Sequence, residues 1–207
     1  MKKLLLIDVC DTLYPENTTV GFINYISKKN DNFGRLKIIK IINSLLYKLI
    51  GVDIIRYKLI QSIKGYSKLE LINFSKKYID SMTPNIDILS LMGEYKCKGY
   101  ELYFLSASLD VVVEVISDKY QAVSFSSSKL KFNNDISEGV LNKDLLGNKN
   151  KILNELSKEY NKITFITDNK SDSNCINLCD EFIAVIPKGK ANDLAYWRKF
   201  NVTTINL

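Results

Sequence analysis

The feature that most constrains the fold is a short apolar run near the N-terminus that ends in acidic residues. Residues 4–7 are all aliphatic, and residues 8–13 continue as Asp-Val-Cys-Asp-Thr-Leu. A continuous apolar run of this length is typical of a strand buried on both faces. Its carboxyl end would present Asp8 at the edge of a parallel sheet, where open α/β proteins build their ligand sites. For Asp8 alone, a carboxylate that only caps the following turn is the alternative.

Two later segments repeat this arrangement of an apolar strand followed by a polar residue. The segment 100–105 is apolar and aromatic and delivers Ser106 at its end. The β-branched segment 163–167 ends in Asp168, and Asp172 follows shortly after. Because the carboxyl ends of parallel strands meet at one edge of a sheet, we expect these side chains to lie near Asp8.

A lysine at the start of a predicted helix completes the set. Lys149 opens an amphipathic segment over 149–159, and Lys151 is the alternative lysine. Each of these motifs is weak by itself. Their order along the chain is the stronger signal, and it predicts one shared site.

Together the four motifs resemble those of the haloacid dehalogenase (HAD) superfamily, and most of all its phosphoserine-phosphatase-like branch. The first motif of that superfamily is Asp-x-Asp-x-Thr-Leu, and this chain departs from it by placing Cys10 where the second Asp stands. The resemblance covers nearly the whole chain. It implies an α/β fold with a doubly wound parallel sheet, a HAD-like Rossmannoid core over 1–14 plus 85–207, and an inserted α-helical cap over 15–84.

The resemblance also implies a reaction. Asp8 would attack a phosphoryl group and form an aspartyl-phosphate, which divides one difficult displacement into two easier steps. Ser106 would hydrogen-bond a phosphoryl oxygen, and Lys149 would neutralise charge in the transition state. A carboxylate and a phosphate repel each other, so a hard divalent cation with oxygen ligands is expected. The implied cofactor is Mg²⁺.

The implied Mg²⁺ ligands and substrate contacts follow from the same resemblance. The carboxylates of Asp8, Asp168 and Asp172 and the backbone carbonyl of Cys10 would hold the metal. Thr12 would contribute to substrate binding. Arg56 resembles the cap arginine that contacts the substrate carboxylate in phosphoserine phosphatases. The stretch 106–108 is Ser-Ala-Ser rather than the Ser-Gly-Gly of those enzymes, which leaves the substrate open beyond a small phosphorylated metabolite.

Cys10 leaves the reaction without its usual acid. In the family pattern, the second Asp protonates the leaving group and then activates water. A thiol is a weak hydrogen-bonding partner, and Asp11 would replace the acid only if the loop bends. The sequence therefore predicts slow hydrolysis, a good leaving group or lost catalysis. The alternative functions are a catalytically weak phosphate-binding or partner protein, and a phosphotransferase or lipid-head-group phosphatase.

The composition limits the classes of partner and the location that are expected for this chain. The net charge of +6 comes with scattered lysines and few arginines, which argues against nucleic-acid binding. An apolar N-terminal run that ends at Asp8 is too short for a signal peptide, and four cysteines without a disulfide pattern predict a cytoplasmic protein. Lysines within 36–60 exclude a membrane-spanning helix, and a helix buried in the cap is favoured over one on a membrane surface. The oligomeric state is left open.

The pattern also predicts the order of the elements. A capping box, Ser67 to Glu70, marks a helix start within a helical region over 18–95. A β-hairpin is expected within 124–148. Strands are expected near 3–8, 100–105, 121–125, 163–167, 182–186 and 202–206, and helices near 108–118, 149–159, 171–178 and 190–199.

Overall fold

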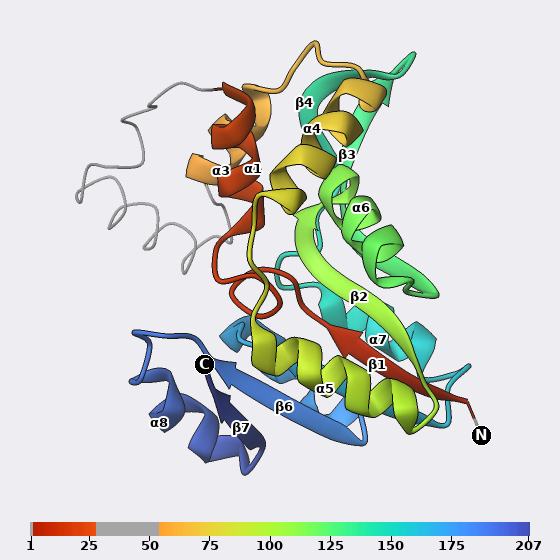
Figure 1. Ribbon diagram of the computed structural model, residues 1–207, viewed down its shortest axis with the longest axis vertical. Helices are drawn as coiled ribbons and strands as arrows, with labels where there is room; N and C mark the ends of the chain where they lie inside the picture. Colours follow the sequence, from red (N-terminus) through yellow and green to blue (C-terminus); the bar gives the residue numbers. More distant parts are fainter. Residues whose placement is uncertain (1, 28–53) are drawn as a thin grey trace.

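The computed structural model describes residues 2–27 and 54–207 of the 207-residue chain (Figure 1). Its strands are β1 (Lys3–Ile7), β2 (Tyr100–Leu109), β3 (Ser124–Asn133), β4 (Ile136–Lys143), β5 (Lys162–Thr167), β6 (Glu181–Ile186) and β7 (Thr203–Asn206). Its α-helices are α1 (Thr18–Ser27), α3 (Ile54–Gln61), α4 (Lys68–Asp80), α5 (Ile86–Cys97), α6 (Asp110–Tyr120), α7 (Lys149–Leu156) and α8 (Asp193–Trp197). Two 3-10 helices, η2 (Lys170–Leu178) and η3 (Arg198–Phe200), follow β5 and α8.

The strands form one seven-stranded sheet in the order β4-β3-β2-β1-β5-β6-β7. All neighbouring pairs are parallel except β3 and β4, which form an antiparallel hairpin. The chain builds outward from β1 through β2 and β3, and then returns to the other side of β1 with β5. This reversal beside β1 is the switch point at which open α/β sheets bind ligands. The predicted doubly wound parallel sheet is confirmed.

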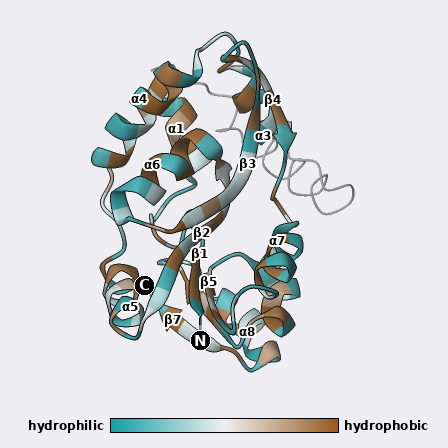
Figure 2. Ribbon diagram, turned by 90° about the vertical axis from the view of Figure 1, so that its right-hand side faces the viewer, coloured by the Kyte–Doolittle hydropathy of each residue, from teal (hydrophilic) through white to brown (hydrophobic). Residues whose placement is uncertain are grey.

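Alternate residues of β1 enter two separate cores. Leu5 and Ile7 belong to the core that contains residues of α5 and α6, whereas Leu4 and Leu6 belong to the core that contains residues of α7 and α8. Side chains of a strand point alternately to opposite faces, so a continuous apolar run requires cover on both. Figure 2 shows α5 on one side of the central strands and α7 and α8 on the other.

A long bulge in β2 shapes the site. Leu105 pairs with Ser126 and Leu109 pairs with Ser128, so residues 106–108 of β2 lie opposite a single residue of β3. The extra residues leave the regular ladder, and such bulges redirect side chains next to active sites. Strand β2 includes the bulge and runs to Leu109, so α6 begins at Asp110 rather than near 108.

Three of the described helices between β1 and β2 lie beside the hairpin (Figure 1). Figure 1 shows α1, α3 and α4 at the end of the molecule where β3 and β4 lie. The backbone of Gly65, Tyr66 and Lys68 hydrogen-bonds that of the hairpin at Ser137 and Asp135. The two ends of this helical segment also meet, because the amide of Asn85 donates to the carbonyl of Leu13 over 2.8 Å. The division into a core over 1–14 plus 85–207 and a cap over 15–84 stays a prediction that these contacts support.

Most element predictions are confirmed, with local corrections. The capping box of Ser67 and Glu70 is present at the start of α4. Strand β3 begins at Ser124 and not at 121, because α6 runs to Tyr120 and Gln121 ends it in the left-handed conformation. The segment expected as a helix over 171–178 is the 3-10 helix η2.

Two helices are shorter than expected, and one lies partly outside the described residues. The helix expected over 149–159 ends at Leu156, and the helix expected over 190–199 is divided between α8 and η3. Most of the predicted helix over 36–60 lies outside the described residues. Within residues 2–27 and 54–207, no helix has the length and apolar character needed to cross a bilayer.

Candidate active site

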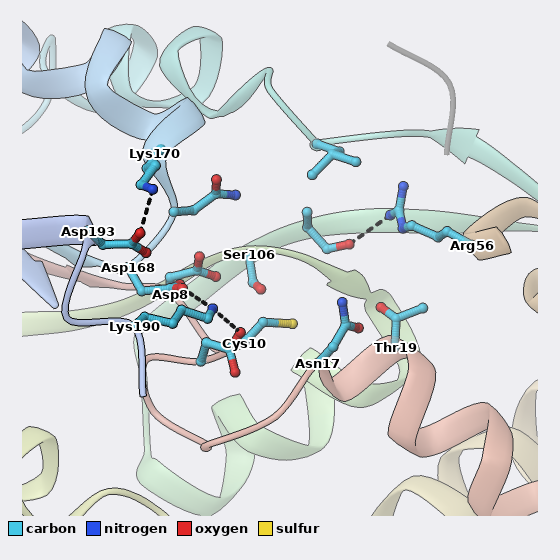
Figure 3. Close-up of a pocket in the computed structure, with 14 residues that line it drawn as sticks. Asp8, Cys10, Asn17, Thr19, Arg56, Ser106, Asp168, Lys170, Lys190 and Asp193 are labelled. Atoms are coloured by element: carbon cyan, nitrogen blue, oxygen red, sulfur yellow. Dashed lines mark hydrogen bonds and ion pairs between the residues drawn. The ribbon is translucent and has the colours of Figure 1, made fainter. Parts of the chain in front are cut away.

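A pocket of about 340 Å³ opens at the carboxyl ends of β1, β2 and β5 (Figure 3). Asp8 follows β1, Ser106 lies in the bulge of β2, and Asp168 follows β5. The strand ends therefore bring together three side chains that are far apart in the sequence. The pocket is lined by Asp8, Cys10, Asp11, Asn17, Thr19, Arg56, Ser106, Ala107, Leu146, Asp168, Asn169, Lys170, Lys190 and Asp193.

Beside the pocket, a buried lysine joins two buried carboxylates. The Lys149 Nζ atom lies 2.6 Å from Asp8 Oδ2 and 2.7 Å from Asp172 Oδ2, and its side chain is 1% exposed. Burial acts to lower the pKa of Lys149, but Asp172 and Asp8 outweigh it and raise that pKa above its ordinary value. Lys149 therefore stays positively charged and remains paired with the Asp8 carboxylate. Lys151, the alternative lysine, is exposed.

Thr167 ties the same carboxylates to the end of β5. Its hydroxyl lies 2.7 Å from Asp172 Oδ2 and 3.3 Å from Asp8 Oδ2, and it accepts the amide of Asn169 over 3.1 Å. Burial raises the pKa of Asp172, and the charge of Asp8 raises it further, although Lys149 opposes both. Asp172 does not line the pocket. Its contacts hold Lys149 in place.

Asp168 is held on two sides. Its amide donates to the hydroxyl of Thr12 over 3.0 Å, and Lys190 Nζ lies 3.5 Å from its carboxylate. Burial and the negative charge of Asp8 raise the pKa of Asp168 to about 7. Thr12 is buried behind this contact and is not among the lining residues, so its predicted role in substrate binding stays a prediction.

Asp11 reaches the pocket because the loop after β1 bends. Its backbone adopts a φ of 50°, in the left-handed region that Asp tolerates better than most residues. Lys190 Nζ lies 2.8 Å from Asp11 Oδ2, so Lys190 pairs with both Asp11 and Asp168. Figure 3 shows Lys190 beside Asp168.

A chain of hydroxyl groups connects Ser106 to Cys10. Ser106 Oγ lies 3.0 Å from Ser108 Oγ, which is 2.7 Å from Thr18 Oγ1. Cys10 Sγ lies 3.1 Å from both Ser108 Oγ and Thr18 Oγ1. Burial raises the pKa of the Cys10 thiol, and Asp8 raises it further. The group in the position of the family acid is therefore a neutral thiol among hydroxyls.

Arg56 enters the pocket wall from α3, and its guanidinium is bound by protein groups. Its NH1 atom lies 2.5 Å from Asp144 Oδ2, and NH2 donates to the carbonyl of Ala107 over 2.8 Å and to Ser128 Oγ over 3.0 Å. The side chain is 10% exposed. Arg56 thus lies at the predicted site, and its contact with a substrate stays a prediction.

The structure is similar to those of several phosphatases. A phosphoserine phosphatase, solved as a phospho-aspartyl intermediate analogue, matches with a TM-score of 0.71 at 19% identity over 99% of this chain and 93% of that chain. A phosphoserine phosphohydrolase-like protein from Francisella tularensis subsp. tularensis matches with a TM-score of 0.69 at 19% identity, over 99% of this chain and 95% of that one. The chain has the haloacid dehalogenase fold.

A HAD family hydrolase from Salmonella enterica subsp. enterica serovar Typhi matches with a TM-score of 0.72 at 17% identity. The match covers 98% of this chain and 66% of that hydrolase, so the chain spans about two thirds of its length. No family model and no curated protein matches the sequence. At these identities the likeness establishes the HAD fold, and the function has to be argued from the pocket.

The donors in this HAD-fold pocket fit Mg²⁺ in part. Asp8 and Asp168 face one pocket. The pKa of Asp168 is raised by burial and by the charge of Asp8, and a cation bound between the two carboxylates would offset that repulsion. Mg²⁺ commonly binds one or two carboxylates together with water and substrate phosphate. Within residues 2–27 and 54–207, no three Asp, Glu, Cys or His side chains form a metal-binding group. The expected role of Asp172 and of the Cys10 carbonyl as ligands stays a prediction.

Sequence reasoning missed several residues of the pocket. Lys190 was not predicted, although it follows the end of β6 and thus lies at the same sheet edge as Asp8. Asn17 and Thr19 were also missed, since polar residues at the start of a helix carry no distinguishing pattern. The contact between Arg56 and Asp144 joins residues far apart in the chain and left no signal in the spacing.

Proposed function

We propose that this protein is a Mg²⁺-dependent phosphoric monoester hydrolase that forms an aspartyl-phosphate on Asp8. The observation that carries the proposal is the buried Asp8 carboxylate, which lines the pocket and is bound by Lys149 Nζ over 2.6 Å. A carboxylate held at a strand end with a fixed positive charge is suited to attack an electrophilic phosphorus.

Each of the surrounding groups has a part in the first step. Asp8 attacks the phosphorus, the bond to the leaving oxygen breaks, and the phosphoryl group is transferred to the carboxylate. Ser106 donates a hydrogen bond to a phosphoryl oxygen. Lys149 stabilises the negative charge near Asp8 as it spreads over the phosphoryl oxygens. These roles need no proton transfer.

Mg²⁺ held by Asp8 and Asp168 would screen the repulsion between Asp8 and the phosphate and polarise the phosphoryl group. Asp172 keeps Lys149 in position through its 2.7 Å contact. Thr12 orients Asp168 through the amide of that residue.

Proton donation to the leaving group is expected to be weak, and this limits the range of substrates. The Cys10 thiol has a raised pKa and is bound by Thr18 and Ser108, so it is a poor proton donor to an alkoxide. We therefore propose preferred turnover of esters with good leaving groups. The same observation favours the second candidate, a phosphate-binding protein that hydrolyses its ligand slowly.

The pocket supports a small phosphorylated metabolite as the substrate class. Its volume of about 340 Å³ accommodates a small molecule, and its lining is mainly polar or charged. Asn17 and Thr19 on the α1 side face the non-reacting end. All four cysteines are free, which is consistent with the proposed cytoplasmic location.

The test is hydrolysis of p-nitrophenyl phosphate with Mg²⁺ by the wild type and by Asp8→Asn. The amide keeps the shape of the carboxylate but is not a nucleophile, so we expect turnover to disappear while the protein stays folded. Mass spectrometry of acid-quenched wild type should show one phosphoryl group on the peptide that contains residue 8. Turnover retained by Asp8→Asn would refute the covalent mechanism. Phosphate binding without turnover by the wild type would favour the second candidate.

A further inference from the structure

The guanidinium of Arg56 forms several hydrogen bonds with protein groups in the pocket wall. Two of its nitrogens bind three acceptors, on Asp144, Ser128 and the carbonyl of Ala107, at 2.5 to 3.0 Å. The planar guanidinium presents its donors in a fixed fork, so such a set of contacts fixes its orientation. The arginine is nearly buried, whereas the side chain of Asp144 is 42% exposed. Asp144 compensates the charge of Arg56 and thereby weakens its attraction for a substrate anion.

The acceptors of Arg56 are themselves joined. Ser128 Oγ donates to Asp144 Oδ1 over 3.0 Å and accepts the amide of Leu145 over 3.1 Å. Asp144 Oδ1 also accepts the amide of Leu146 over 2.9 Å. The Ser128 hydroxyl thus uses its single proton and accepts two hydrogen bonds. Arg56, Ser128 and Asp144 form one connected group, here called the Arg56 cluster.

This cluster touches two segments that carry the proposed chemistry. Ala107 lies between Ser106 and Ser108 in the bulge of β2, where the regular ladder to β3 is interrupted. Ala107 has no paired residue in β1 or β3, and Arg56 donates a hydrogen bond to its carbonyl. On the other side, Asp144 holds the turn at Leu145 and Leu146 that leads into α7 and Lys149.

We infer that Arg56 is a positioning residue, which links helix α3 to the Ser106 bulge and to the turn before Lys149. The inference rests on the proposed phosphatase function and deepens it, because it makes helix α3 part of the catalytic geometry. Displacement of a positioned group by about 1 Å can cost about 10²-fold in rate. In this role Arg56 affects the reaction by fixing the position of Ser106. The effect is therefore expected for every substrate, whether or not the non-reacting end of that substrate is charged.

The experiment compares Arg56→Met, Asp144→Asn and the double variant with Lys64→Met as the control. Lys64 is an exposed lysine just after α3, so its substitution removes a positive charge away from the pocket. Two probes are used with Mg²⁺: p-nitrophenyl phosphate, which has no anionic group besides its phosphate, and phosphoserine, which has a carboxylate. Hydrogen–deuterium exchange is followed in the peptide that covers 105–109.

We expect Arg56→Met to lower kcat for p-nitrophenyl phosphate by roughly 10- to 100-fold with a smaller change in KM. Asp144→Asn should lower this kcat by a similar factor. The kcat of the double variant should be only slightly lower than that of either single variant, because both substitutions disrupt the same cluster. Exchange in 105–109 should be faster in all three variants and unchanged in Lys64→Met.

A different pattern would overturn the inference. If Arg56→Met raised KM for phosphoserine alone and left p-nitrophenyl phosphate and exchange unchanged, Arg56 would be a substrate ligand. If the wild type hydrolysed neither probe, the proposed function would fail separately, and exchange would decide the positioning role. Faster exchange in 105–109 would support that role, and unchanged exchange would refute it.

Discussion

The two sides of the pocket differ in charge. On one side, Lys149 joins Asp8 to Asp172, and Asp168 stands beside them with a pKa raised to about 7. On the other, Cys10 lies among hydroxyl groups and bears no charge of its own. The buried ion pairs of Lys149 therefore lie where the phosphoryl group would be attacked, whereas the group that would face the leaving oxygen is neutral.

For the proposed phosphatase reaction, this difference predicts unequal support for the two half-reactions. Attack by Asp8 needs charge stabilisation, which Lys149 and a metal would provide. Departure of an alkoxide and later attack by water need a proton donor and acceptor, and the Cys10 side offers a thiol whose pKa is raised. Four predictions test this contrast.

The largest effect is expected on the charged side, with Lys149→Met. The substitution leaves two buried carboxylates without their cation, so we expect a loss of about 3–5 kcal/mol in the free energy of unfolding. Turnover of p-nitrophenyl phosphate should fall by roughly 10³-fold. Lys151→Met is the control, because Lys151 is exposed. Equal losses in both variants would mean that Lys149 has no special role.

On the neutral side, Cys10→Asp should restore the missing acid. We expect kcat/KM for an alkyl phosphate to rise by roughly 10²-fold, with a smaller gain for an aryl phosphate, whose leaving group needs less protonation. Cys10→Asn is the matched control, since it has the shape of Asp but cannot transfer a proton. If Cys10→Asp and wild type hydrolysed the alkyl ester equally, another group, such as Asp11, would already act as the acid.

A smaller change is expected at Asp168, at the edge of the charged side. Asp168→Asn removes one of the two carboxylates proposed to hold Mg²⁺, and the affinity measured by calorimetry should fall by about tenfold or more. Asp193→Asn is the control, because Asp193 lines the same pocket but pairs with Lys170. Unchanged affinity in Asp168→Asn would remove that residue from the metal site.

The last prediction concerns the pH dependence of stability without added metal. The pKa of Asp168 is about 7 in the folded protein, whereas an Asp in an unfolded chain titrates near 3.9. Between these values the folded chain binds more protons than the unfolded chain, so stability should decrease as the pH rises from about 4 to about 7. Thermal melts should show this decrease in the wild type and a weaker one in Asp168→Asn. Parallel curves for the two proteins would contradict the assignment.

The sequence was sufficient to predict the strands and the polar residues at their carboxyl ends. The apolar run before Asp8 requires burial on both faces, and the same logic predicted Ser106 and Asp168 at strand ends. Asp168 follows β5 as predicted, whereas Ser106 lies in the bulge near the carboxyl end of β2. Parallel strands align their carboxyl ends, so the order of the motifs predicted that these residues share one pocket. Lys149 was predicted at the start of its helix, though its contact with Asp172 was not.

The tertiary structure decided the contacts between residues that are distant in the chain. The spacing of Arg56, Ser128 and Asp144 carries no periodic signal, and only the packing of α3 on the hairpin brings them together. Lys190 approaches Asp11 because the chain bends at a left-handed residue after β1. Local patterns depend on the period of a strand or helix, whereas these side-chain pairs depend on how the elements pack. The sequence by itself therefore determined the sheet and the residues at its edge, and only the folded chain decided which charges meet there.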